Sequence, residues 1–203
     1  MITEHTSAWK TSRTLLTRVK DQKDEQSWED FVFYYRPFIY NVVRGMNIAH
    51  HDAEEIVQNV LLKAWNKLPK FEYDRGRGRF RGWLCMVTGN TVRDFLRKRK
   101  LPLEDISHEG AGEAHSLHYT ESPEIDKIAD REWRRYISKL AWESVSKRFK
   151  PQVTQAFLMA IQSIPVETIV KELEIAESTV YVYKCRVQKE LRKEIIQLNR
   201  FLG

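Results

Sequence analysis

The sequence is poor in cysteine and contains no long apolar run. Its two cysteines, Cys85 and Cys185, lie far apart, so they indicate neither a disulfide framework nor a Cys-x-x-Cys metal pair. No apolar stretch approaches the roughly 20 residues that span a bilayer, and residues 1–10 show no charged-then-apolar leader. We therefore expect a protein of a reducing cytoplasm, with no membrane span and no bound cofactor.

Lysine and arginine are absent from one long segment, and acids are nearly absent from the segment before it. Residues 101–126 contain seven acids and no Lys or Arg, whereas residues 75–100 contain nine basic residues and one acid, Asp94. The net charge of +6 and the pI near 9.3 average over these blocks. A basic surplus suggests an anionic partner, and an apolar fraction of 42% is enough for a packed core.

The basic segment also carries the side chains of Phe80, Trp83, Asn90 and Phe95. Arginines contact phosphates, aromatic rings offer faces to unstacked bases, and an amide offers a donor and an acceptor to a base edge. We interpret the segment as a surface for single-stranded or melting nucleic acid, in which Asn90 and the rings before it receive an extruded base. We expect Trp83 in the core and Phe80 to be the more available ring. The alternative is a solvated basic helix face.

Apolar residues recur at three- and four-residue steps through most of the chain, which predicts an all-α fold. The clearest helix covers residues 52–68, with Asp52 and Glu55 spaced as a capping box and Pro69 at its end. Its polar face carries an exposed leucine, and we interpret that face as a docking patch for a protein. The residues of the patch are Gln58, Asn59, Leu62 and Lys63.

Three further features qualify this helical pattern. Pro37 predicts a kink or boundary in an early helix, and Gly89 is expected to loosen a helix over residues 80–100. The cluster HHDAEE at residues 50–55 places polar groups consecutively rather than four residues apart, so we expect no metal site there.

Residues 101–124 are acidic, contain Gly, Ser and Pro, and show little periodicity. This segment predicts a flexible acidic linker between two small helical domains, residues 1–100 and residues 125–203. The second domain ends in two short helices, the first opened by Pro165 and the second capped by Ser178, with a tight connection at residues 174–176. Such a pair indicates a helix-turn-helix, although an ordinary helical hairpin gives the same pattern.

In a helix-turn-helix the N-terminal part of the second helix enters the major groove of DNA. The residues expected on that groove-facing side are Ser178, Thr179, Tyr181, Val182, Cys185, Arg186 and Lys189. Lys184 and Lys193 are expected nearer to the DNA backbone.

Four segments together resemble an extracytoplasmic-function (ECF) sigma factor, the two-domain minimal form of bacterial sigma factor. They are SWEDFVFYYRPFIY, DAEEIVQNVLLKAW, FRGWLCMVTGNTVRDFLRKRK and VETIVKELEIAESTVYVYKCRVQKELRKE. Two positions depart from the family pattern: Glu174 stands where many relatives have Gly in the turn, and Tyr183 replaces a frequently basic residue.

The resemblance implies a non-enzymatic subunit whose partners are core RNA polymerase and promoter DNA, with an anti-sigma factor left open. Gln58, Asn59, Leu62 and Lys63 would contact the clamp helices of the largest polymerase subunit. The helix after Ser178 would read the minus-thirty-five element, and Asn90 would help to capture a flipped base. The residues assigned to the minus-ten region are Arg75, Arg77, Arg79, Phe80, Asn90, Arg93 and Arg97.

Two other classes of protein are weighed against this interpretation. A transcriptional regulator that is not a polymerase subunit would use the helix-turn-helix as its only DNA module. A nuclease would need convergent carboxylate or His side chains near the basic region, and Asp74 and Asp94 alone do not supply them.

Overall fold

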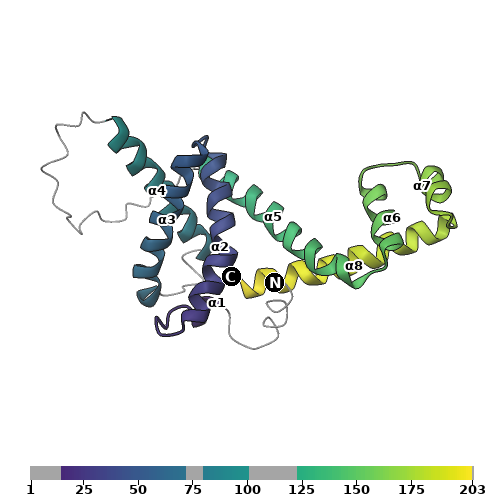
Figure 1. The fold of residues 1–203 in the computed structure, drawn as a ribbon, viewed down its shortest axis with the longest axis horizontal. Helices are drawn as coiled ribbons and strands as arrows, with labels where there is room; N and C mark the ends of the chain where they lie inside the picture. Colours follow the sequence, from purple (N-terminus) through teal and green to yellow (C-terminus); the bar gives the residue numbers. More distant parts are fainter. Residues whose placement is uncertain (1–14, 72–79, 101–122, 203) are drawn as a thin grey trace, which may run out of the picture. The chain divides into compact units, whose positions relative to one another are not determined.

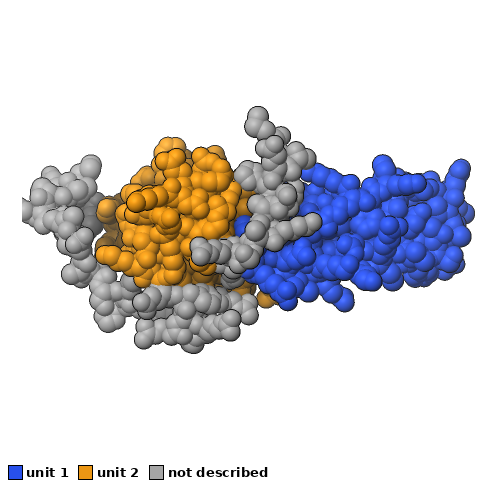
Figure 2. Space-filling view, turned by 90° about the horizontal axis from the view of Figure 1, so that it is seen from below, with its two compact units in different colours: residues 1–12, 135–201 blue, residues 13–134, 202–203 orange. Residues whose placement is uncertain are grey.

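The computed structural model describes residues 15–71, 80–100 and 123–202 (Figure 1). All regular secondary structure in these three stretches is helical, which confirms the predicted all-α fold. The chain forms two compact units, drawn in Figure 2: Arg13–Arg134 with Leu202–Gly203 in orange, and a unit that contains Arg135–Phe201 in blue. The division between the units falls between Arg134 and Arg135, inside a helix.

Three long helices build the orange unit. They are α2 (Glu25–Gly45), α3 (His50–Lys67) and α4 (Phe80–Lys100), with the short α1 (Leu15–Arg18) before them and the 3-10 helix η2 (Leu68–Lys70) after α3. The three long helices pack on one another and bury large side chains of each, such as Phe31, Ile56 and Leu84. α2 runs through Pro37 without ending there, so the predicted boundary at this residue is absent.

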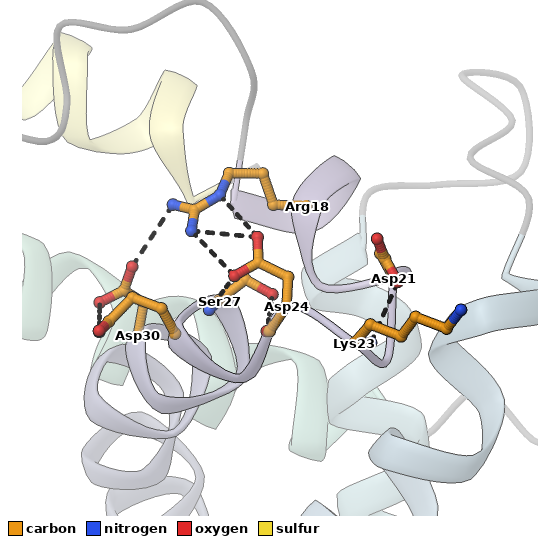
Figure 3. Close-up of polar contacts among 7 residues, drawn as sticks. Arg18, Asp21, Lys23, Asp24, Ser27 and Asp30 are labelled. Atoms are coloured by element: carbon orange, nitrogen blue, oxygen red, sulfur yellow. Dashed lines mark hydrogen bonds and ion pairs between the residues drawn. The ribbon is translucent and has the colours of Figure 1, made fainter.

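The N-terminus of α2 is held by a polar network that Figure 3 shows in close-up. Asp24 is the N-cap residue, and its side chain accepts a hydrogen bond from the Ser27 N–H at 2.9 Å. The Arg18 guanidinium donates to both carboxylate oxygens of Asp24, at 3.2 and 3.3 Å, and lies 3.5 Å from the buried Asp30 carboxylate. One arginine therefore joins α1 to the first two turns of α2.

α3 begins three residues earlier than the predicted capping box requires, at His50 instead of Ala53. Its N-cap residue is Ala49, which makes no side-chain cap hydrogen bond. Asp52 therefore lies inside the first turn, where the helix dipole favours a carboxylate, and it accepts a hydrogen bond from Arg99 of α4 at 2.6 Å. The capping-box prediction was wrong because the partner of Asp52 comes from a neighbouring helix.

The first half of α5 (Pro123–Val145) belongs to the orange unit. Trp133 lies against Tyr35 and Phe38 of α2, with ring centroids 6.3 and 5.1 Å apart. A Cβ atom built on Gly89 would come within 2.7 Å of the Ile125 Cδ1 atom. The absence of a side chain at Gly89 therefore allows α5 to pack closely against α4. α4 is continuous through Gly89, so the expected disruption of the helix at this residue is absent.

The blue unit contains the end of α5, the 3-10 helix η4 (Ser146–Arg148), α6 (Pro151–Ile161), α7 (Val166–Leu173) and α8 (Glu177–Phe201). α6, α7 and α8 share a core that includes Met159, Ile169 and Val180. The buried carboxylate of Glu194 accepts hydrogen bonds from Ser144 at 2.8 Å and Arg148 at 2.7 Å. These contacts fix α8 against the end of α5, while α6 and α7 together pack against the N-terminal turns of α8.

Candidate nucleic-acid and partner interfaces

The polar face of α3 presents an exposed apolar centre. The Leu62 side chain is 59% exposed, and Gln58 and Asn59 beside it are exposed as well. Lys63 is half-buried because its Nζ atom donates to Thr91 Oγ1 at 3.1 Å and lies 3.6 Å from Asp94 Oδ2. The patch predicted from the sequence therefore contains three exposed side chains and one lysine tied to α4.

The basic segment divides into a described and an undescribed part. Arg75, Arg77 and Arg79 lie outside the described residues. Arg81 is engaged within the orange unit, because its guanidinium lies 3.5 Å from Asp130 and 5.0 Å from the centroid of the Trp133 ring.

Asn90, Arg93 and Arg97 line one side of α4. Arg93 and Arg97 are exposed and Asn90 is half-buried. Arg93 Nη1 donates to Asn90 Oδ1 at 2.6 Å, and Arg97 Nη2 donates to Asp94 at 3.4 Å. Since arginine has donors only, the Arg93 contact requires the amide oxygen of Asn90 to face Arg93 and leaves the NH₂ group of Asn90 for another acceptor.

Phe80 does not offer a face to a base. Its side chain is fully buried, and its ring centroid lies 6.0 Å from Phe31, 5.4 Å from Tyr35 and 5.3 Å from Trp83. Trp83 is half-buried, so the expected roles of the two rings are reversed. The four-residue step from Phe80 to the buried Leu84 is the pattern in the sequence that could have indicated this.

The turn between α7 and α8 has the left-handed conformation that a Gly would favour. Glu174 ends α7 with φ 51° and ψ 45°, and its N–H donates to the Val170 carbonyl. Only Gly, and less often Asn or Asp, adopts this conformation at low cost. Glu174 therefore occupies this turn at a cost in backbone strain.

α8 presents one face to solvent along its first three turns. It begins at Glu177, so Ser178 lies inside the first turn. The prediction that Ser178 is the N-cap residue was wrong. The exposed side chains on this face are those of Ser178, Tyr181, Val182, Cys185, Arg186 and Lys189, while Thr179 and Lys184 are half-buried. The Arg186 guanidinium lies 5.4 Å from the centroid of the Phe149 ring, a cation–π contact that holds the arginine beside the face.

In the stretches that the structure describes, the remaining reactive groups do not form a further chemical site. Burial raises the pKa of the Cys85 thiol to about 12, so this thiol stays protonated, while Cys185 is exposed. His50 shares a hydrogen bond with the Tyr40 hydroxyl at 2.8 Å. Within the described stretches no group of three His, Cys, Asp or Glu side chains is placed to hold a metal ion, and no helix is long and apolar enough to cross a membrane.

Comparison with known proteins relates the chain to sigma factors. A family model described as sigma-70 region 2 matches residues 31–101, which cover α2 from Phe31, α3 and α4. The ECF RNA polymerase sigma factor SigE of Mycolicibacterium smegmatis is 27% identical over 79 residues, 39% of this chain and 29% of that protein. SigW of Bacillus subtilis, also an ECF RNA polymerase sigma factor, is 31% identical over 85 residues, 41% of this chain and 44% of that protein.

The matched part of the chain thus spans less than half the length of these two curated relatives. The RNA polymerase sigma factor CnrH of Cupriavidus metallidurans is 34% identical over 58 residues, 29% of each protein. A solved structure of CnrH in complex with the cytosolic domain of CnrY aligns with a TM-score of 0.35 and 17% identity, covering 88% of this chain and 93% of that one.

Proposed function

We propose that the chain is a sigma factor of the ECF type, which binds core RNA polymerase and directs promoter-specific initiation in the cytoplasm. The match of residues 31–101 to sigma-70 region 2 and the similarity to ECF sigma factors support this proposal. The chain acts as a specificity subunit and not as an enzyme. Three observations support the proposal: residues 31–101 match sigma-70 region 2, α3 presents an exposed apolar centre at Leu62, and α7 and α8 have the arrangement expected of a helix-turn-helix.

Docking to polymerase is assigned to Gln58, Asn59, Leu62 and Lys63 of α3. Leu62 supplies apolar area at the centre, and the polar side chains around it supply hydrogen bonds, which is the usual organisation of an interface hot spot. The clamp helices of the largest polymerase subunit are the proposed partner.

Opening of the minus-ten region is assigned to α4 and the residues before it. Arg93 and Arg97 supply exposed positive charge for phosphates, and Asn90 offers its NH₂ group to a base acceptor because its oxygen accepts from Arg93. Arg75, Arg77 and Arg79 remain assigned to the minus-ten region, because they directly precede α4 in the sequence. Phe80 is withdrawn from it because its ring is buried.

Recognition of the minus-thirty-five element is assigned to the exposed face of α8 at Ser178, Thr179, Tyr181, Val182, Arg186 and Lys189, with Lys184 beside it. Arginine and lysine make the commonest specific contacts to guanine in the major groove. On the family resemblance we add an anti-sigma factor to the proposed partners, and co-purification from the native cells would test it.

The decisive experiment is transcription in vitro with core polymerase and the full chain on a promoter library. We expect transcripts from a subset of promoters that share two sequence elements. Binding to core polymerase without promoter selectivity, or DNA binding with no affinity for polymerase, would contradict the proposal. The second outcome would instead support a helix-turn-helix regulator that is not a polymerase subunit.

Leu62→Asp tests the docking patch. A charge at the centre of the interface should weaken binding to core polymerase at least about thirtyfold, while helix content by circular dichroism stays unchanged because Leu62 is exposed. Ile196→Asp is the matched control, since Ile196 is another exposed apolar residue, 47% exposed, on α8. Equal binding by both variants would remove α3 from the docking assignment.

Asn90→Ala tests base capture. The variant should bind closed upstream duplex as the parent does, yet open the promoter less and lose its preference at one downstream position. Permanganate reactivity of promoter thymines on single-base variants measures both effects. Arg97→Ala, which removes a charge from the same helix, should weaken binding to all sequences alike. Full opening by Asn90→Ala with unchanged base preference would exclude the amide from the mechanism.

A further inference from the structure

Val182 is unusually exposed for an apolar side chain in this protein. It is 61% exposed, the largest value among the exposed large apolar side chains of the described residues, and its neighbour Tyr181 is 51% exposed. Both lie in the second turn of α8, on the face that also carries Ser178 and Cys185. The small side chains of Ser178 and Cys185, one turn before and one turn after, leave Val182 as the projecting apolar group.

Packing within the unit does not account for this valine. α8 contributes Val180 and Val187 to the core, and these lie on the opposite side of the helix. Helix propensity does not account for it either, because a β-branched residue loses side-chain freedom in a helix and is a poorer helix former than Ala or Leu. Val182 therefore contributes little to the stability of the isolated chain.

The major groove offers one apolar group to such a side chain. Among the base edges exposed there, only thymine carries a methyl group, at C5. The side chains that read adenine in pairs of hydrogen bonds are Asn and Gln, and residues 177–189 contain no Asn and a single Gln, Gln188. An A·T pair facing the start of α8 is therefore most readily read from its thymine side.

We propose that Val182 contacts the C5-methyl group of a thymine in the upstream promoter element and so determines specificity for one A·T pair. The proposal rests on the proposed function of α8. Arg186, held beside Phe149, and Lys189 lie one and two turns further along the same face. The reading face thus has an apolar N-terminal part for a thymine methyl and a basic part for guanine.

The test uses the full chain and duplexes that it selects from a randomised library. Each thymine of a selected duplex is replaced in turn by deoxyuridine, which removes only the C5-methyl group. The unmodified protein should lose about fourfold in affinity at one position, the effect of one buried methyl group. Val182→Ala should bind the parent duplex about fourfold more weakly and show no further loss at that position.

Ile196→Ala is the matched control, because it truncates an exposed apolar residue of the same helix well beyond the first three turns. It should keep the fourfold loss at the same thymine. Selection of a sequence that is insensitive to every deoxyuridine replacement overturns this proposal alone. Selection of no sequence overturns the proposed function of α8 and this inference with it. If Val182→Ala keeps the deoxyuridine effect and loses binding to core polymerase instead, Val182 belongs to a protein interface and the proposal is overturned.

Discussion

Glu174 is a residue whose backbone conformation and chemical identity conflict. Its φ of 51° lies in the left-handed region, which costs an L-residue roughly 1–2 kcal/mol, while Gly visits it freely at the expense of about 0.5–1 kcal/mol of unfolded-state entropy. Glu174→Gly should therefore raise the free energy of unfolding by up to about 1 kcal/mol. Thermal unfolding of the full chain measures the change.

Glu172→Gly is the control for this prediction. Glu172 is exposed and lies inside α7, two residues earlier, so the same substitution there should lower the free energy of unfolding by about 1 kcal/mol. Equal destabilisation by both substitutions would contradict the strain assigned to Glu174.

At the residue scale the sequence predicted the exposure of some side chains and not of others. Leu62 and Val182 were expected on exposed faces, and both are exposed. Phe80 and Trp83 were reversed: the step from Phe80 to Leu84 places Phe80 on the buried side of α4, and the rings of Phe31 and Tyr35 on another helix lie against it. The hydrogen bond from Arg93 to Asn90 was not predictable from the sequence either, because it depends on the side-chain conformation of Arg93.

Among the elements, α5 shows what close approach between helices requires. A Cβ atom on Gly89 would meet Ile125 Cδ1 at 2.7 Å, whereas a Cβ atom on Gly82 of the same helix would meet nothing within 4 Å. Gly82→Ala should raise the free energy of unfolding by up to about 1 kcal/mol through helix propensity. Gly89→Ala should lower it by about 1 kcal/mol, because overpacking outweighs the same gain.

Limited proteolysis separates this effect from a general loss of stability. If Gly89→Ala displaces the first half of α5 from α4, trypsin should cleave faster after Lys127 and Arg131, which are exposed residues of that segment. Gly82→Ala should leave those cleavage rates unchanged. A higher free energy of unfolding for both variants, with unchanged trypsin cleavage, would contradict the prediction. It would mean that the Ile125 side chain rotates away from residue 89 without loss of stability.

The helices themselves were largely predictable, because buried apolar side chains at three- and four-residue spacing mark them directly. α3 and the α7–α8 pair appear where the pattern placed them, within a few residues. The start of α3 was not predictable from capping preferences, because its N-cap residue Ala49 makes no side-chain cap hydrogen bond. The packing of Ile125 against Gly89 was not predictable either, because the two residues are distant in the sequence.

For the whole molecule, charge is the property most open to experiment. The seven acids of residues 101–126 lie directly after the basic end of α4, and two arrangements are compatible with this: a solvated spacer, or an acidic segment that masks the cations of residues 97–100. In the described part of the chain Arg97 already pairs with Asp94 at 3.4 Å and Arg99 with Asp52 at 2.6 Å. The linker predicted at residues 101–124 lies almost entirely outside the described residues. Because these pairs already supply partners for part of the cation cluster, we expect the solvated spacer.

Neutralising Glu104, Asp105, Glu109 and Glu113 together, as Gln or Asn, distinguishes the two arrangements. The net charge rises from +6 to +10, but a solvated spacer acts on DNA only through a field that salt screens within about 8 Å at 0.15 M ionic strength. We expect the affinity of the free protein for duplex DNA to rise by less than about threefold at that salt concentration and by more at 0.01 M. A matched variant with Glu25, Glu29, Glu167 and Glu172 changed to Gln carries the same net charge and should behave alike. A tenfold gain in DNA affinity at 0.15 M, seen only in the first variant, would contradict the solvated spacer. It would mean that these acids contact the basic end of α4 directly, because salt weakens a direct contact much less than a long-range field.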